Sequence, residues 1–516
     1  MTDAPRELAE LRRRAAEIAD LSAVAGLMMW DQNVMMPPGG AAPRADQMET
    51  LERILHDRLT DPALGRLLDA LEPWAASADP DSDDVRLVAM IQRDHRKAVR
   101  VPTDLAAELS NAAALAHQAW QEARVAQDFA GFRPALERVL DLTHRYAACF
   151  DGTGEFAHPY DVLLDDYEPG LTTAELRGIF GRLQEDLVPL VSAAAALSPE
   201  QGDPRVLPGT HPEAAQRALM DEVLKAVGFV SDRWRLDPTV HPFARSMAPT
   251  DVRITTRWEP DDLGMAFYSC LHEFGHGLYE AQMDPAHYRT TLGDAAGLGV
   301  HESQSRLWEN LVGRSRPFCE WVLPMLRRHL GGPFDALDGG DLYRMVNRVQ
   351  LSLVRIEADE TTYNLHIALR FELELALVEG RLEVKDLPTA WDEATERLLG
   401  LHTPDLLHGV LQDIHWGSGM IGYFPTYTLG NLMAAQLWEA LAVDLPELDA
   451  DVAAGRFGPL REWLREHIHR HGRKFPSREL LRRATGQELS VEPWLAYLER
   501  KLLDAGLLLE PVRGRT

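Results

Sequence analysis

The sequence predicts an all-α fold that contains one small β element. Apolar residues recur at the i, i+3, i+4 and i+7 positions of amphipathic helices through most of the chain. Residues 234–260 break this pattern because they are rich in Pro, Thr and Val. Hydrophobic residues make up 45% of the 516 residues and charged residues 26%, a balance typical of a packed globular protein. We therefore expect a large helical core with a small hairpin or short sheet.

The spacing of apolar residues predicts the helices and one strand along the chain. The predicted helical stretches are residues 5–27, 44–72, 84–148, 173–197 and 304 almost to the C-terminus. The run Val252–Arg257 alternates apolar and polar residues and predicts a strand. Turn-rich pieces lie between these stretches, but none is long or simple enough to be a flexible linker. We therefore expect a single domain over residues 1–516, with room for two lobes that flank a cleft.

The charge balance argues against two classes of partner. Lys and Arg total 53 against 80 Asp and Glu, which gives a net charge of −27 at pH 7. A field of this sign repels phosphate backbones and anionic lipid headgroups, so we expect neither nucleic acid nor a membrane as partner. Residues 1–21 lack the apolar core of a secretory signal, and no run reaches the ~18 apolar residues of a membrane span. These features predict a cytoplasmic protein.

A metal-binding motif lies within residues 261–283, which have the periodicity of a helix. The motif is His272-Glu273-Phe274-Gly275-His276, an HExxH sequence. Residues four apart on a helix share a face, so both imidazoles can reach one ion. Glu273 can then lie beside the remaining coordination position and act as a general base. The three cysteines lie outside any CxxC pattern, so the ligands must be nitrogen and oxygen atoms.

A catalytic zinc site needs a third protein ligand and an open position. After a Gly-rich connection, the apolar positions from Val300 to Leu311 predict a second helix that starts near His301. Glu302 lies in the first turn of this helix, and a helix packed beside the first could bring its carboxylate to the metal. Glu309 is the competing ligand because it lies seven residues on, although a surface or supporting role fits it better.

The sequence HESQSRLWEN, which follows HEFGH, resembles the carboxypeptidase Taq family of metallocarboxypeptidases. Further blocks similar to the family occur in order along nearly the whole chain: LMMWDQNVMMPPGG, PYDVLLDDYEPGLT, HPF, DVRITTR, RIEADE, GVLQDIHW and GYFPTYTLGN. The resemblance implies a helical zincin with a deep substrate groove, similar in shape to neurolysin and angiotensin-converting enzyme. It also implies a homodimer that removes single residues from peptide C-termini with broad preference.

The resemblance assigns the metal ligands and the base to positions in this chain. It implies that His272, His276 and Glu302 hold one Zn²⁺ and that Glu273 is the general base. Cobalt is a possible substitute because a His₂Glu ligand set accepts several divalent ions. On this reading, Glu273 deprotonates a zinc-bound water, which attacks the last peptide bond, and then passes the proton to the departing amine.

A carboxypeptidase also has to recognise a free carboxylate, which the planar guanidinium of Arg binds in bidentate fashion. We expect Arg355 to be this anchor, because its segment has the pattern of a buried helix, and Arg253 to be the alternative. The competing interpretation of Arg355 is an ion pair with an acidic side chain. His241 is expected to shape the substrate pocket, and Asp251 to pair with Arg253.

The tetrahedral intermediate of peptide hydrolysis needs a hydrogen-bond donor besides the metal. His415, Tyr423 and Tyr427 fit that need, and Tyr423 ranks first. Two other functions compete with that of a zinc carboxypeptidase. A neurolysin-like oligopeptidase would share the metal ligands but cleave inside short peptides. An inactive zincin would serve as a peptide-binding protein.

Overall fold

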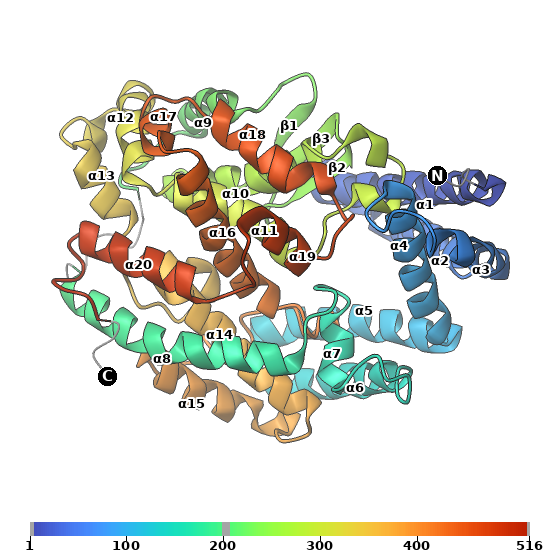
Figure 1. The fold of residues 1–516 in the computed structure, drawn as a ribbon. Helices are drawn as coiled ribbons and strands as arrows, with labels where there is room; N and C mark the ends of the chain where they lie inside the picture. The colour runs from blue at the N-terminus through green and yellow to red at the C-terminus, as the bar shows by residue number, and fades with distance from the viewer. Residues whose placement is uncertain (1–4, 199–206, 513–516) are drawn as a thin grey trace. The chain divides into compact units, whose positions relative to one another are not determined.

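The computed structural model describes residues 5–198 and 207–512. The described chain is almost entirely helical with one three-stranded sheet (Figure 1), which confirms the predicted all-α fold with a small β element. Two compact units are present, and each is assembled from three separate segments. Among the described residues, unit 1 comprises 5–99, 207–346 and 436–489, and unit 2 comprises 100–198, 347–435 and 490–512.

Unit 1 contains the sheet and most of the helices. Its strands are β1 (Trp234–Pro238), β2 (Ala244–Ala248) and β3 (Asp251–Thr256). Its helices are α1 (Arg6–Val34), α2 (Ala41–Leu59), α3 (Pro62–Ala75), α4 (Asp83–Arg100), α9 (Glu213–Val227), α10 (Leu263–Ala281), α11 (Leu298–Arg306), α12 (Arg316–Leu330), α13 (Gly339–Val346), α17 (Leu448–Ala453), α18 (Gly458–His467) and α19 (Ser477–Thr485).

Unit 2 consists of helices and loops, and its described residues contain no strand. Its helices are α5 (Thr103–Ala126), α6 (Phe129–Ala148), α7 (Pro159–Leu164), α8 (Thr173–Leu197), α14 (Glu360–Val378), α15 (Leu387–Leu399) and α20 (Glu492–Asp504). Helix α14 packs against α8 and α15 (Figure 1). Helix α16 (Pro425–Asp444) begins in unit 2 and ends in unit 1. None of the described helices is long and apolar enough to cross a membrane.

The sheet supports the metal-binding helix α10. Strand β3 lies in the centre, parallel to β1 and antiparallel to β2. A Cβ on Gly277 of α10 would lie 2.7 Å from the Trp234 ring and 2.8 Å from Val252, so glycine permits the close packing of α10 on the sheet. The N-terminus of α10 is capped by Asp262, whose side chain accepts a hydrogen bond from the Met265 amide.

The predicted helical stretches contain breaks that periodicity does not detect. Residues 44–72 form two helices, because Asp61 caps α3 and Pro62 begins it. Residues 84–148 form three helices. The prediction of helix from 304 almost to the end is wrong for residues 347–359 and 400–424, which form turns and loops. The second loop buries Leu411, Trp416 and Phe424, so its apolar residues are core residues of an irregular segment.

Candidate metal centre

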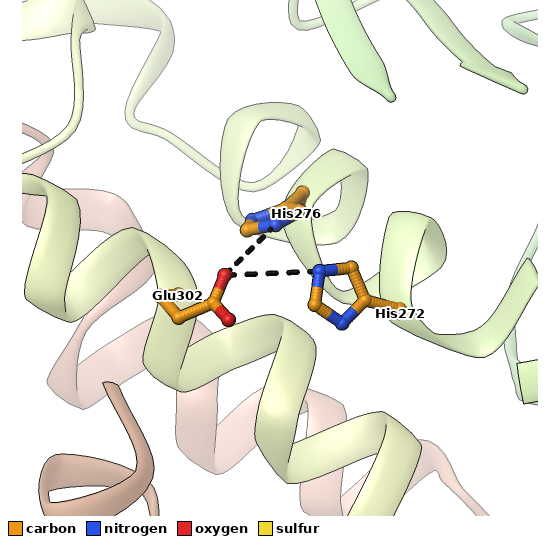
Figure 2. Close-up of side chains that lie close together, drawn as sticks. All are labelled: His272, His276 and Glu302. Carbon is orange, nitrogen blue, oxygen red and sulfur yellow. Dashed lines mark ion pairs between the residues drawn. The ribbon is translucent and has the colours of Figure 1, made fainter. Parts of the chain in front are cut away.

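The structure brings together the three side chains that the sequence assigns to the metal (Figure 2). His272 and His276 lie one turn apart on α10, and Glu302 projects toward them from α11. Glu302 Oε2 lies 3.5 Å from His276 Nε2 and 3.7 Å from His272 Nε2. These three atoms lie within 4.8 Å of one another, a spacing that a single metal ion can bridge.

Glycine at position 275 allows α11 to approach α10 this closely. A Cβ at Gly275 would lie 2.4 Å from the carbonyl oxygen of Gln304. The second x of the HExxH motif therefore sets the separation of the two helices that carry the ligands. Helix α11 begins at Leu298, three residues before the predicted start at His301, so Glu302 lies in its second turn.

The protonation states of His276 and Glu302 suit metal binding, and that of Glu273 suits proton acceptance. Burial lowers the pKa of His272, but the charges of Glu302 and Glu309 outweigh it and raise that pKa above its usual value. Burial lowers the pKa of His276 to about 3, so its imidazole is neutral and retains a lone pair at pH 7. Burial opposes ionisation of Glu302, but the charges of Arg306 and His272 outweigh it and hold the pKa of this carboxyl well below its usual range. Glu273 is 6% exposed, and burial raises its pKa to about 7.

Glu309 supports the site from behind His272. The Nδ1 of His272 donates a hydrogen bond to Glu309 Oε2 over 2.8 Å, on the side of the ring away from Glu302. Glu309 lies in the π-helical turn Leu307–Val312, and such turns often occur at functional sites. The supporting role that the sequence favoured for Glu309 agrees with this contact.

Arg306, which was not among the residues predicted from the sequence, links the two carboxylates. Its Nε donates to Glu302 Oε1 over 2.6 Å, and its NH1 donates to Glu309 Oε2 over 3.2 Å. Arg306 thereby occupies one oxygen of Glu302 and leaves Oε2 directed at the two imidazoles. Its position four residues after Glu302 on a predicted helix was the available signal, because side chains at i and i+4 are neighbours.

In unit 2, Arg355 lies in a buried network of charges. Its Nε and NH2 donate to Asp413 Oδ1 over 3.1 and 2.8 Å, and its NH1 donates to the Tyr363 hydroxyl over 3.1 Å. Asp413 Oδ2 accepts from Arg370 Nε over 2.6 Å. The predicted buried position of Arg355 is correct, since it is 7% exposed, but the residue lies in the 3₁₀ turn Arg355–Glu357 and not in a helix. The ion pair considered as the alternative is present, with Asp413 as its acid.

The aromatic residues predicted near the reaction lie together in unit 2. The His415 ring lies 5.5 Å from that of Tyr423, and His415 Nε2 lies 3.3 Å from the Tyr427 hydroxyl. The Nδ1 of His415 lies 3.7 Å from Asp413 Oδ1, which joins this group to the arginine network. Burial lowers the pKa of His415 to about 4, so the ring is neutral at pH 7 and retains one N–H donor.

The remaining predicted residues lie in unit 1. Arg253 of β3 donates to both carboxylate oxygens of Asp251 over 2.9 and 3.0 Å, which agrees with the expected pairing. The Arg253 guanidinium also lies 4.4 Å from the centre of the Trp30 ring. His241 is exposed in the connection between β1 and β2. Arg253 is thus held by an acid and an aromatic ring, as Arg355 is held by Asp413 and Tyr363.

Comparison with known proteins decides the family. A family model described as carboxypeptidase Taq (M32) metallopeptidase matches residues 10–502. The chain belongs to this family. The family resemblance seen in the sequence is therefore confirmed, and the chain is a metallocarboxypeptidase, a hydrolase of peptide bonds whose family implies a metal cofactor.

Relatives of the carboxypeptidase Taq family match along nearly their full length. Thermostable carboxypeptidase 1 of Thermus thermophilus is 43% identical over 502 residues, which cover 96% of this chain and 98% of that protein. Carboxypeptidase 1 of Bacillus subtilis is 34% identical and covers 98% and 99% of the two chains. The crystal structure of the M32 carboxypeptidase from Deinococcus radiodurans aligns with a TM-score of 0.92 at 40% identity, over 97% of this chain and all of that one.

Proposed function

We propose that the protein is a zinc-dependent carboxypeptidase that removes single amino acids from peptide C-termini with broad preference. The observation that carries the proposal is the convergence of Glu302 Oε2 on both imidazoles of an HExxH motif in a chain of this family. We further propose that the chain works as one catalytic domain with two lobes, as a homodimer in the cytoplasm.

The ligand geometry fits zinc. Ligands about 2.0–2.1 Å from a tetrahedral zinc ion lie about 3.3 Å from one another, close to the separations of 3.5 and 3.7 Å between Glu302 Oε2 and the two imidazoles. Two histidines and one glutamate are also the ligand set of several zinc peptidases. Zinc held by these residues would act as a Lewis acid and lower the pKa of a bound water to about 7.

Glu273 is proposed as the general base because of its place in the motif and its burial. A pKa of about 7 makes this carboxyl able both to accept a proton from the attacking water and to donate it to the departing amine at neutral pH. His272 and His276 flank Glu273 on the same helix, so the base and the ligands are held by one rigid element.

The charge of the buried network supports recognition of an anion by Arg355. Burial favours the neutral form of Asp413, but Arg370 and Arg355 outweigh it and hold its pKa well below its usual range, so the carboxylate is ionised. Two guanidinium groups face this single carboxylate, which leaves one excess positive charge in a buried site. Because an uncompensated buried charge is costly, a substrate carboxylate would be stabilised there.

The other predicted residues keep the roles that the sequence suggested. Tyr423 and His415 are proposed to donate hydrogen bonds to the oxyanion, and Tyr427 to contact the substrate near Arg355, whose guanidinium carbon lies 5.2 Å from the Tyr427 ring. His241 is proposed to contribute to the substrate pocket. Arg253 remains the second choice for the carboxylate anchor.

Mass spectrometry of the products from N-terminally blocked tripeptides tests this function directly. We expect release of the last amino acid, loss of that release with a chelator, and recovery with zinc. Internal cleavage would indicate the neurolysin-like oligopeptidase instead. Bound zinc without any hydrolysis would indicate a peptide-binding protein on an inactive zincin fold.

A further inference from the structure

Unit 2 contains a buried carboxylate, that of Glu374 on α14, to which none of the roles above has been assigned. The side chain is completely buried. Its Oε1 accepts hydrogen bonds from the Tyr160 hydroxyl over 2.5 Å and from the Gly422 amide over 2.7 Å. Its Oε2 accepts from Trp416 Nε1 over 2.6 Å. Both oxygens are therefore engaged, and all three donors are neutral groups.

Two of the three donors come from the two ends of one loop, which carries proposed reaction residues. Trp416 directly follows His415, and Gly422 directly precedes Tyr423. The backbone between them turns tightly, since the Met420 amide donates to the His415 carbonyl over 2.9 Å. A single carboxylate thus fixes both ends of residues 416–422, and with them the separation of the His415 and Tyr423 rings.

The third donor joins this loop to helix α7. Tyr160 lies in α7, and a Cβ at Gly422 would lie 2.9 Å from the backbone of Leu163 in the same helix. Gly422 has a φ of +92°, a conformation that glycine adopts without strain. The loop end before Tyr423 is therefore pressed against α7 and held there by Glu374.

Packing alone does not account for an acid at this position. A buried carboxylate without a cationic partner is costly, and an apolar side chain would fill the same volume without that cost. An acid at position 374 can instead accept three directed hydrogen bonds at once, which no apolar residue can. These three hydrogen bonds hold residues 416–422 in one conformation.

We propose that Glu374 is a positioning residue that holds His415 and Tyr423 in the geometry needed for transition-state stabilisation. This inference rests on the proposed function, because it gives His415 and Tyr423 their part in peptide hydrolysis. The hydrogen bonds of Glu374 are made to the loop and to α7. Its effect on the rate passes through the loop.

Glu374→Gln is the first test, because the amide keeps the volume but turns an NH₂ group toward at least one of the donors. A misplacement of about 1 Å can cost about 100-fold in rate, so we expect kcat to fall by about 10- to 100-fold. KM and zinc content should stay within about twofold of the unmodified protein, because ground-state binding is retained. Glu372→Gln, on the same helix, pairs with Arg397 at the surface and serves as the matched control with unchanged kcat.

A double-mutant cycle gives the deciding comparison. In a His415→Asn/Tyr423→Phe background, Glu374→Gln should lower kcat by less than about threefold, because the residues it positions are already removed. Equal losses in both backgrounds, or no loss in either, would overturn the inference. If the unmodified protein releases no C-terminal residue, the proposed function itself fails. If the unmodified protein is active but Glu374→Gln lowers kcat equally in both backgrounds, only the proposed role of Glu374 is rejected.

Discussion

His272 lies between two carboxylates, one at each edge of its ring: Nδ1 donates to Glu309 Oε2 over 2.8 Å, and Nε2 faces Glu302 Oε2 at 3.7 Å. The hydrogen bond to Glu309 fixes the tautomer that leaves the Nε2 lone pair available for a metal. Glu302 and Glu309 therefore have different tasks, although both lie next to the same imidazole. Glu302 faces the space between the two imidazoles, and Glu309 orients one of them.

Replacing Glu302 and Glu309 separately distinguishes the metal ligand from the residue that orients His272. Glu302→Ala removes a metal ligand, so bound zinc should fall well below one per chain after dialysis. Glu309→Ala should keep zinc near one per chain but weaken its affinity by about 10- to 100-fold, as loss of an orienting hydrogen bond does. Metal analysis and chelator competition measure both. The reverse ranking would mean that Glu309 is the third ligand.

Glu273→Gln should keep zinc and lose turnover. The amide occupies the same volume but cannot accept a proton from water, and loss of a general base costs at least about 100-fold in kcat. Zinc content and kcat are measured on the same preparation. Activity comparable to that of the unmodified protein would show that another group is the base.

Arg355→Ala should weaken recognition of the free C-terminus. Loss of one partner of a desolvated ion pair costs about 2–5 kcal/mol, so kcat/KM on free-acid peptides should fall by roughly 30- to 5,000-fold with zinc retained. The same variant should lose much less on C-terminally amidated peptides, which lack the charge. Equal losses on both substrates would assign Arg355 to support of Asp413 and make Arg253 the next anchor to test.

Glu374 should make the stability of the protein depend on pH. Burial raises its pKa from 4.5 to about 7, so the folded protein binds this proton more tightly than the unfolded chain does. The resulting stabilisation is complete below pH 4.5 and is lost as the pH rises through 7, a change of about 3 kcal/mol. Between pH 5 and 8, the urea midpoint of the unmodified protein should decrease relative to that of Glu374→Gln. If the urea midpoints of the two proteins changed with pH in parallel, the raised pKa would not belong to Glu374.

The sequence predicted the helices and placed His272 and His276 on one helix face because both depend on local spacing, whereas the choice of Glu302 came from the family resemblance. His272 and His276 share a face by their separation of four residues, and Glu302 follows in a motif of the family. The close approach of α10 and α11 depends on Gly275, whose neighbour Gln304 is distant in sequence. Local pattern contains no information on that contact.

The loop between α15 and α16 shows where sequence reasoning fails. Leu411, Trp416 and Phe424 are buried, as the apolar residues of a core helix are, yet their segment is irregular. What holds it are contacts across long sequence separations, such as those of Asp413 with Arg355 and of Trp416 with Glu374. The spacing of apolar residues indicates which positions are buried. It does not distinguish a buried loop from a buried helix.

Zinc titration of the chelated protein tests the central claim most directly. Bound zinc and the rate of release of the C-terminal amino acid from a blocked tripeptide are followed in the same samples. We predict that activity rises in proportion to bound zinc and reaches its maximum at one zinc per chain, with no release before zinc is added. Full activity in the chelated protein, or one bound zinc per chain without release, would contradict this account.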